Sequence, residues 1–246
     1  MSDIQQQTAQ GVLRINLNRP QKKNALNQQM YRDLTAALRE ATDDSSIRVV
    51  LLYGNEYSFS AGNDLQDFLG AGELNSEHPT VQFLYQLAQF PKPIIAAVSG
   101  LAIGIGTTAL LHCDLVYAAN NARFQLPFTQ LGLCPEAGSS VLLPHIIGYQ
   151  RAAQYLLLGE AFDAEQALQM GLVNQVVQYN ELLALADEKA RVLAALPADA
   201  VQTSKTLLKR HSQALTIDTI ASELLQFQRL LETEQCQQRI AAFFRR

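Results

Sequence analysis

Short runs of consecutive apolar residues, separated by stretches with helical periodicity, constrain the fold of this chain more than any other feature. Two such runs cover residues 48–53 (RVVLLY) and 94–98 (IIAAV), and a further strand is predicted over residues 115–118 (LVYA). Continuous apolar runs of this length are typical of strands that are covered on both faces by other elements. The chain is therefore expected to contain a sheet packed between helices.

The segment before the first run supplies a strand and a helix. Residues 12–17 (VLRINL) alternate between apolar and polar side chains, which indicates a half-buried strand. A helix is expected to follow, with Asn27 as its N-cap and with an apolar stripe formed by Met30, Leu34, Leu38 and Ala41. A strand, a helix and a buried strand in succession predict a βαβ unit and thus an α/β fold.

Towards the C-terminus the pattern changes. Strand patterns end at about residue 184, and helical periodicity covers residues 182–196, 198–210 and 217–231. We therefore expect an α/β core over residues 1–183 and a helical C-terminal region over residues 184–246. No internal repeat is visible in the sequence.

Composition excludes several classes of protein. Of the 246 residues 48% are hydrophobic and 17% charged, and the net charge of −4 comes from interspersed signs, so neither a nucleic-acid partner nor an acidic membrane surface is indicated. The three cysteines have no zinc-site spacing, and no metal site is predicted. No apolar run reaches the length of a membrane span, and the polar N-terminus lacks the features of a signal peptide. We expect a cytoplasmic protein.

A glycine-rich segment at residues 104–109 (GIGTTA) allows three interpretations. By letters it matches the dinucleotide-binding fingerprint GxGxxG/A. That motif directly follows a first strand and is followed about 20 residues later by an acidic residue. Here residues 100–103 intervene, and no Asp or Glu occurs near Gln125. The sequence therefore disfavours a dinucleotide site.

The second interpretation is a site for a localised negative charge. A helix that begins at residues 104–106 presents unpaired N–H groups at its start, and glycine lets a ligand approach the backbone closely. The segment that follows, residues 107–113, is almost wholly apolar and is expected to be buried. In the third interpretation, the glycines only allow a helix to pack closely against a strand.

Several segments, in order, resemble the enoyl-CoA hydratase/isomerase (crotonase) superfamily. They are residues 18–20 (NRP), 24–26 (NAL), 59–65 (FSAGNDL), 92–100 (KPIIAAVSG), 102–106 (AIGIG), 113–118 (CDLVYA), 124–128 (FQLPF) and 171–173 (GLV). The resemblance covers nearly the whole chain and is highly specific for the fold. It is less specific for the reaction, because this superfamily carries out many reactions on one enolate-stabilising frame.

The resemblance implies a fold, an assembly and an oxyanion hole. The fold is a crotonase-like spiral of ββα units, and the C-terminal region would serve oligomerisation, as a homotrimer or a dimer of trimers, and closure of the CoA site. The oxyanion hole would use two backbone N–H groups, which by motif position belong to Asn63 and Ile105. Each such donor is worth on the order of 3 kcal/mol at a developing oxyanion.

Two carboxylates that would specify water addition are missing. Hydratases of this superfamily use two glutamates as general acid and base. The matching positions of this chain hold Thr108 and Phe128, neither of which can act as a base. The resemblance therefore argues against ordinary hydratase activity.

One carboxylate remains in the same region, in residues 131–140 (LGLCPEAGSS). This segment is similar to the peroxisomal-type Δ3,Δ2-enoyl-CoA isomerases, whose single catalytic glutamate follows a proline, and the match assigns that role to Glu136. Isomerisation needs only one base, and an apolar wall that includes Phe128 and Leu133 would raise the pKa of the carboxyl. From the residues alone, without the resemblance, a helix cap is the favoured interpretation of Glu136.

The CoA part of the substrate also implies binding residues. The resemblance places it against the turns at residues 24–26 and 60–65, and basic side chains are plausible partners for its phosphates. The implied binding set is Lys22, Asn24, Ala25, Leu26, Ser60, Ala61, Gly62, Asn63, Asp64, Leu65, Gly104, Phe128, Leu133 and Lys205. No cofactor is expected beyond the CoA carried by the acyl-CoA thioester itself.

The expected activity is that of an enoyl-CoA isomerase in fatty acid β-oxidation. One alternative keeps the enolate but changes the outcome, to a hydratase, thioesterase or decarboxylase reaction. Another alternative is a non-catalytic homologue that binds acyl-CoA and acts through assembly.

Overall fold

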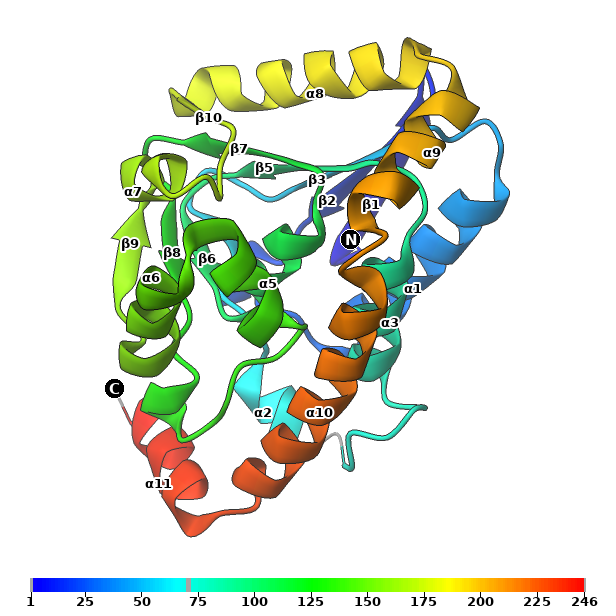
Figure 1. The fold of residues 1–246 in the computed structure, drawn as a ribbon. Helices are drawn as coiled ribbons and strands as arrows, with labels where there is room; N and C mark the ends of the chain where they lie inside the picture. Colours follow the sequence, from blue (N-terminus) through cyan, green and yellow to red (C-terminus); the bar gives the residue numbers. More distant parts are fainter. Residues whose placement is uncertain (1, 70–71, 246) are drawn as a thin grey trace.

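A computed structural model describes residues 2–69 and 72–245 of the chain. Its larger sheet has six strands in the order β1-β2-β3-β5-β7-β10 (Figure 1). These strands are β1 (Ile4–Ala9), β2 (Val12–Leu17), β3 (Val49–Tyr53), β5 (Ile94–Val98), β7 (Leu115–Ala119) and β10 (Gln175–Val177). Only the hairpin of β1 and β2 is antiparallel, whereas the other neighbours in this sheet run parallel. The predicted strands over residues 48–53 and 94–98 are confirmed as adjacent central strands.

A smaller sheet of four strands lies beside the first, in the order β4-β6-β8-β9. The strands are β4 (Ser58–Ser60), β6 (Leu101–Ile103), β8 (Arg123–Gln125) and β9 (Ala161–Asp163), of which β9 runs antiparallel to β8. Three successive pairs, β3–β4, β5–β6 and β7–β8, each place their first strand in the larger sheet and their second in the smaller one. A helical segment follows each pair, so the chain forms the expected spiral of ββα units.

Helices cover both faces of the larger sheet. On one face, α1 (Gln28–Asp43) packs against α3 (Pro79–Gln89), and the predicted cap is present because the Asn27 side chain accepts a hydrogen bond from the N–H of Met30. On the other face, α8 (Tyr179–Ala195) crosses β3, β5 and β7 (Figure 1). Ala186 and Ala190 of α8 are completely buried against the sheet, since their small side chains permit close approach.

The remaining helices complete the fold. They are α2 (Leu65–Leu69), α4 (Ile105–Thr108), α5 (Ser139–Ile147), α6 (Tyr149–Ala153), α7 (Ala164–Gln169), α9 (Ala198–Lys209), α10 (Gln213–Leu231) and α11 (Glu234–Phe243). Helix α4 continues as a 3₁₀ turn over Ala109–His112, and two further 3₁₀ turns cover Pro20–Lys22 and Thr129–Leu131. A π-helical turn, Gln154–Leu158, extends α6. Residue 184, the expected start of the C-terminal region, lies inside α8, which packs on the sheet of the core.

The sequence did not indicate two strands at the edges of the larger sheet. Strand β1 reads IQQQTA and is mostly exposed, because it lies at an edge of the sheet. Its hairpin turns at Gln10 and Gly11, both with positive φ, as a two-residue turn of this kind requires. Strand β10 is only three residues long. Short or polar edge strands carry little hydrophobic pattern for a sequence to show.

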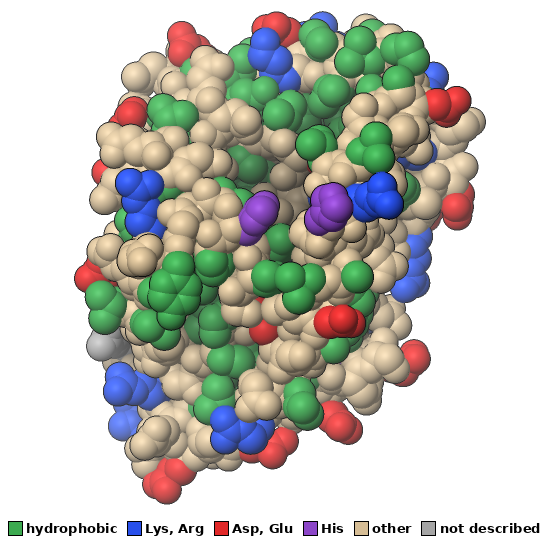
Figure 2. Space-filling model, viewed as in Figure 1, with side chains coloured by type: hydrophobic (Ala, Val, Ile, Leu, Met, Phe, Trp, Pro, Cys, Tyr) green, Lys and Arg blue, Asp and Glu red, His purple; other side chains and the backbone are tan. Residues whose placement is uncertain are grey.

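Large apolar side chains remain exposed on the C-terminal helices. Leu207, Leu208, Leu215 and Leu225 are all more than half exposed, and Leu208 reaches 84%. Figure 2 shows hydrophobic side chains in several groups on one face of the molecule, with acidic and basic side chains dispersed among and around them. Within residues 2–69 and 72–245, no helix combines the length and hydropathy needed to cross a membrane.

Candidate active site

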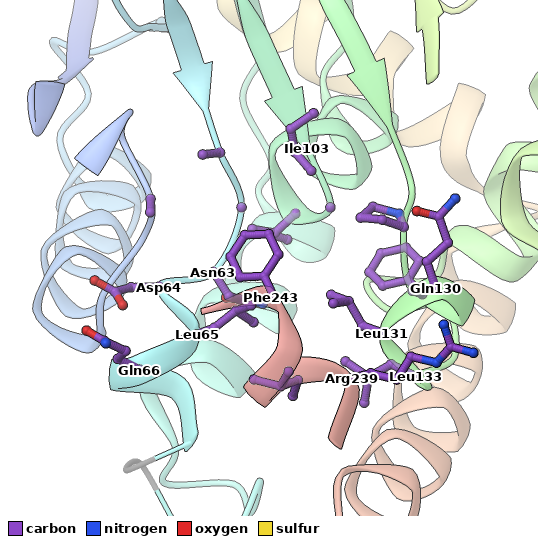
Figure 3. A pocket seen from close by; sticks show the side chains of 18 of the residues that line it. Asn63, Asp64, Leu65, Gln66, Ile103, Gln130, Leu131, Leu133, Arg239 and Phe243 are labelled. Atoms are coloured by element: carbon purple, nitrogen blue, oxygen red, sulfur yellow. The ribbon is translucent and has the colours of Figure 1, made fainter. Parts of the chain in front are cut away.

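A cavity of about 850 Å³ opens between the loop that follows β4, the loop that follows β6 and helix α11. Figure 3 shows Phe243 of α11 lying between the Asn63–Gln66 segment on one side and Leu131 on the other, whereas the Arg239 side chain extends towards Gln130 and Leu133. The cavity brings together most of the residues that the sequence assigns to substrate binding or to the oxyanion hole. These are Lys22, Ala25, Ala61, Gly62, Asn63, Asp64, Leu65, Gly104, Ile105, Phe128 and Leu133.

The first predicted donor is the N–H of Asn63, which points away from the segment that carries Leu26. Leu26 forms a parallel bridge with Asn63, in which the Leu26 N–H donates to the Gly62 carbonyl at 2.8 Å and the Leu26 carbonyl accepts from the Asp64 N–H at 2.9 Å. In such a bridge the backbone groups of the middle residue, here Asn63, point to the opposite side. The N–H of Asn63 is therefore left available beside the cavity that Asn63 lines.

The second predicted donor, the N–H of Ile105, is the first in helix α4. No carbonyl of the helix precedes it, so the helix itself cannot supply an acceptor. Gly104, directly before the helix, has φ of 55° and ψ of −119°, a backbone conformation that glycine adopts readily and other residues rarely do. Its carbonyl accepts hydrogen bonds from the N–H groups of Thr107 and Thr108. Across the described residues neither the Asn63 nor the Ile105 N–H finds an acceptor.

A buried tyrosine of α1 holds the Asn63 side chain. The hydroxyl of Tyr31 donates a hydrogen bond to Oδ1 of Asn63, and Tyr31 is 1% exposed. Burial, together with the nearby Glu136 carboxyl, raises the pKa of Tyr31 well above its ordinary value. The hydroxyl therefore stays protonated and can keep its role as a donor.

Glu136 is a buried carboxyl with one hydrogen-bond donor from α4. Its exposed fraction is 4%, and the Thr108 hydroxyl donates to Oε1 at 2.5 Å. Burial raises the pKa of Glu136 to about 8, although the Thr108 bond acts to lower it, and the charge of Glu223 raises it further. A carboxyl whose pKa lies near neutrality can both accept and return a proton.

The backbone around Glu136 turns sharply. Ala137 and Gly138 both have positive φ, of 59° and 72°, which is unusual for alanine. Nε2 of His112 lies 2.7 Å from the Ala137 carbonyl, and because a carbonyl can only accept, the imidazole donates this bond. Burial lowers the pKa of His112 to about 4, so the ring is neutral. The strained turn is thus held from the same helical segment that carries Thr108.

These contacts place the carboxyl near both backbone donors. Thr108 lies three residues after Ile105, so the two share one face of the helix. Tyr31 bonds Asn63 and is close enough to Glu136 to affect the Tyr31 pKa. Glu136 itself does not line the cavity as it stands. It lies in the wall three residues beyond Leu133, which does.

Other predicted binding residues support the cavity from behind. Asn24 is fully buried, with its Oδ1 accepting from the Arg19 N–H at 2.8 Å and its Nδ2 donating to the Ser58 carbonyl. The Ser60 hydroxyl donates to the Asn24 carbonyl, and Leu26 holds the Asn63 turn. In the described structure Asn24, Leu26 and Ser60 are therefore positioning residues, not part of the cavity surface.

Lys205 corrects a prediction. Its ammonium group is 6% exposed and bonds Asp114 and the Lys92 carbonyl, each at 2.7 Å, at the junction of α9 with the core. Burial lowers the pKa of Lys205 to about 8, while the charge of Asp114 acts in the opposite direction. This lysine serves a structural ion pair and is not a partner for a CoA phosphate. Helical periodicity could not distinguish a buried lysine from a solvated one.

The mouth of the cavity carries other basic groups. Lys22 and Lys23 lie on the turn before β-bridge residue Leu26, and Arg239 lies on α11, all three exposed and lining the cavity. Asp64 is engaged with Arg19 at 2.8 Å. Burial acts to raise the pKa of Asp64, but the Arg19 bond and the Asp67 N–H lower it overall. Asp64 is thus a charge partner of Arg19 at the start of α2.

Residues that the sequence did not reveal come mainly from the helices. Helix α11 contributes Arg239, Ile240 and Phe243, and α10 contributes Phe227 and Leu231. No motif surrounds them, since their role arises only where α11 packs on the 3₁₀ turn over Thr129–Leu131. A methyl group on Gly132 would lie 3.0 Å from Cα of Cys236, which shows how closely these segments approach.

Comparisons with known proteins agree with this architecture. The model of the family described as enoyl-CoA hydratase/isomerase matches residues 7–246. The chain is 36% identical over 240 residues to 1,2-epoxyphenylacetyl-CoA isomerase of Escherichia coli, covering 94% of this chain and 90% of the relative. It is also 36% identical to 2,3-dehydroadipyl-CoA hydratase of the same organism, covering 100% of this chain and 97% of the relative.

A eukaryotic relative and one solved structure extend these similarities. Enoyl-CoA delta isomerase 2 of Rattus norvegicus is 36% identical over 82% of this chain, which spans about half, 53%, of the rat protein. The structure of Pseudomonas aeruginosa OdaA superposes with a TM-score of 0.97 at 41% identity, covering 100% of both chains. The chain therefore belongs to the enoyl-CoA hydratase/isomerase family and has the crotonase fold.

Proposed function

We propose that this protein is a Δ3,Δ2-enoyl-CoA isomerase in fatty acid metabolism, with Glu136 as its only base. The observation that carries this proposal is one buried carboxyl beside two backbone N–H groups, with Thr108 and Phe128 where a hydratase of the family has its glutamates. Phe128 is 5% exposed and apolar, so it offers no route for activating water.

The reaction moves one proton and one double bond. Glu136 takes a proton from carbon 2 of a 3-enoyl-CoA, and the electron pair shifts into the thioester to form a dienolate. The N–H groups of Asn63 and Ile105 hold the negative oxygen, each contributing on the order of 3 kcal/mol. Glu136 then returns the proton to carbon 4, which leaves the double bond between carbons 2 and 3. For these transfers the acyl group has to extend past Leu133 to the carboxyl.

The environment of Glu136 suits this cycle. A pKa of about 8, raised by burial, makes the carboxylate a stronger base than an exposed glutamate and keeps its acid form available for the return step. Leu133 and Phe128, both buried at the cavity, exclude water that would otherwise quench the dienolate.

Binding of the CoA portion is assigned to the basic mouth. Lys22, Lys23 and Arg239 surround the open end of the cavity and can pair with phosphate oxygens. Trimeric assembly, or a dimer of trimers, remains our prediction from the family resemblance, and the exposed leucines of α9 and α10 support it. A cytoplasmic location likewise remains an expectation.

A hydratase activity is the second candidate, and a specific observation favours it. A relative at 36% identity across the full chain is named 2,3-dehydroadipyl-CoA hydratase. Water addition would require a second acid-base group near carbon 3. The Thr108 hydroxyl already donates to Glu136, so it does not fill that role.

Two substrates distinguish these candidates. Incubation with 3-hexenoyl-CoA should produce 2-enoyl-CoA, detected by its conjugated thioester absorbance and by chromatography. Crotonyl-CoA should be hydrated far more slowly. Hydration of crotonyl-CoA at an enzymic rate would overturn the one-base assignment, whereas acyl-CoA binding with no conversion of either substrate would favour a non-catalytic homologue.

A further inference from the structure

A second buried carboxyl, Glu223 of α10, lies next to the turn that follows Glu136. It is not one of the reacting groups of the proposed isomerisation. Glu223 is 7% exposed. Helix α10, which carries it, lies far from Glu136 in the sequence. Helix α10 packs directly on the loop, since a methyl group on Gly138 would lie 3.0 Å from Cγ2 of Thr216. Glu223 therefore reaches the turn that follows Glu136 from outside the cavity.

Both oxygens of Glu223 are used on that turn. Oε2 accepts from the Gly138 N–H at 2.6 Å, and Oε1 accepts from the Ser140 N–H at 2.9 Å and from the Ser140 hydroxyl at 2.5 Å. Burial raises the pKa of Glu223 overall, but three donors on its two oxygens act in the opposite direction and stabilise the ionised carboxylate. These bonds satisfy N–H groups at the start of α5, which no carbonyl within that helix can accept.

The turn needs such an external support. Ala137 and Gly138 hold positive φ in succession, and a non-glycine residue such as Ala137 is strained in this region. The His112 bond fixes the Ala137 carbonyl from one side, and Glu223 fixes the Gly138 N–H from the other. Together they determine the direction in which the Glu136 side chain leaves the backbone.

Glu223 also acts on Glu136 through its charge. The titratable groups near Glu136 are Tyr31 of α1, His112 of the 3₁₀ turn after α4, Cys134 of the same loop and Glu223 of α10. Burial keeps Tyr31 and Cys134 protonated and His112 neutral near pH 8, because the pKa of Cys134 rises to about 11 and that of His112 falls to about 4. Among these neighbours Glu223 supplies the charge.

We propose that Glu223 is a positioning residue of the reaction, which fixes the loop of Glu136 and holds a negative charge beside it. The turnover part of this inference rests on the proposed function, and the structural part does not. It makes helix α10 part of the catalytic apparatus: any displacement of α10 from the core would both release the base and change its proton affinity.

The variant Glu223→Gln tests the proposal, because glutamine keeps the shape but has one acceptor oxygen and no charge. In this variant kcat for 3-hexenoyl-CoA should fall about 10- to 100-fold with KM roughly unchanged, as expected when a reacting group is misplaced. The titration midpoint of Glu136, measured by 13C NMR of labelled glutamate and assigned by its loss in Glu136→Gln, should move to lower pH. The matched control is Asp218→Asn, which removes an exposed charge from the same helix and should change neither quantity.

The NMR midpoint requires no turnover, so it separates this proposal from the proposed function. If the wild type shows no isomerisation but the midpoint moves in Glu223→Gln, the charge effect of Glu223 on Glu136 stands and the isomerase assignment fails. A folded Glu223→Gln variant with an unchanged midpoint and unchanged kcat would reduce Glu223 to a structural cap. If that variant does not fold, Ser140→Ala removes only the hydroxyl bond to Glu223. Its kcat should still fall severalfold, and an unchanged kcat in Ser140→Ala would count against the proposal.

Discussion

The two halves of the candidate active site are built in different ways. The half that would hold the oxyanion consists of backbone N–H groups at Asn63 and Ile105, fixed by the strands and helices of the core. The half that would move the proton consists of one side chain, Glu136, on a strained turn that α10 supports. Substitution at 105 can leave the donor intact, whereas nearly any substitution at 136 removes the base. The first half therefore depends on fold, and the second on residue identity.

The largest effect is expected where identity matters most. Glu136→Gln keeps the size of the side chain but cannot accept a proton, so kcat for 3-hexenoyl-CoA should fall about 10³-fold, within the range of general acid–base catalysis. Acyl-CoA affinity should be nearly unchanged, because Glu136 does not line the cavity. Steady-state kinetics and calorimetric titration with a saturated acyl-CoA measure the two quantities. Retained turnover would remove Glu136 from the mechanism.

A somewhat smaller loss should follow when the backbone half is broken. Ile105 is the first residue of α4, where proline is tolerated, so Ile105→Pro deletes the N–H while preserving the start of the helix. Loss of one oxyanion donor should lower kcat about 10²-fold.

The matched control for that variant is Ile105→Val, which keeps the N–H and trims a side chain that is 1% exposed. It should lose stability by about 1 kcal/mol in a denaturant titration but retain most of its turnover. Equal losses of kcat in Ile105→Pro and Ile105→Val would mean that packing, and not the donor, matters at this position.

The same division explains what the sequence could and could not reveal. The apolar runs predicted a sheet covered by helices, the family resemblance implied the ββα spiral, and glycine at 104 marked the turn at which a backbone N–H is exposed. Those features are local, so a sequence can show them. The bonds of Tyr31 with Asn63 and of Glu223 with Gly138 join segments far apart in the chain, and neither residue stands in a motif. The wrong assignment of Lys205 has the same origin, since its burial depends on how α9 meets Asp114.

The pKa of Glu136 can be changed by a substitution that leaves the N–H groups of Asn63 and Ile105 in place. Glu136 must be ionised to act as a base, and its pKa is about 8, so kcat/KM should rise as pH increases through about 8. Thr108→Val removes a hydrogen bond that favours the ionised form, which raises the pKa of Glu136. The rising limb should therefore move to higher pH.

The pH profile of kcat/KM for Thr108→Val, compared with wild type, measures this shift. Activity at pH 7 should drop severalfold, by up to about tenfold for a shift of one pH unit, and should recover towards the wild-type value above the new midpoint. Thr107→Val is unsuitable as a control, because the Thr107 hydroxyl donates a hydrogen bond to the Ala102 carbonyl within β6. A limb that stays at the wild-type midpoint would show that Thr108 does not influence the base.

The smallest effects should come from the mouth of the cavity, which belongs to neither half. Lys22→Ala and Arg239→Ala each remove an exposed cation, so each should raise KM for the acyl-CoA by roughly threefold, because exposed ion pairs contribute about 0.2–1 kcal/mol. Added salt should produce a similar rise in the wild type and little further change in the double variant. Lys189→Ala, on α8 and outside the cavity, is the control. Since the proposed CoA site places these charges at the CoA end of the substrate, kcat should be constant throughout this series. A fall in kcat would mean that CoA binding and the placement of the acyl group at Glu136 are coupled, and that α11 carries that coupling through Arg239.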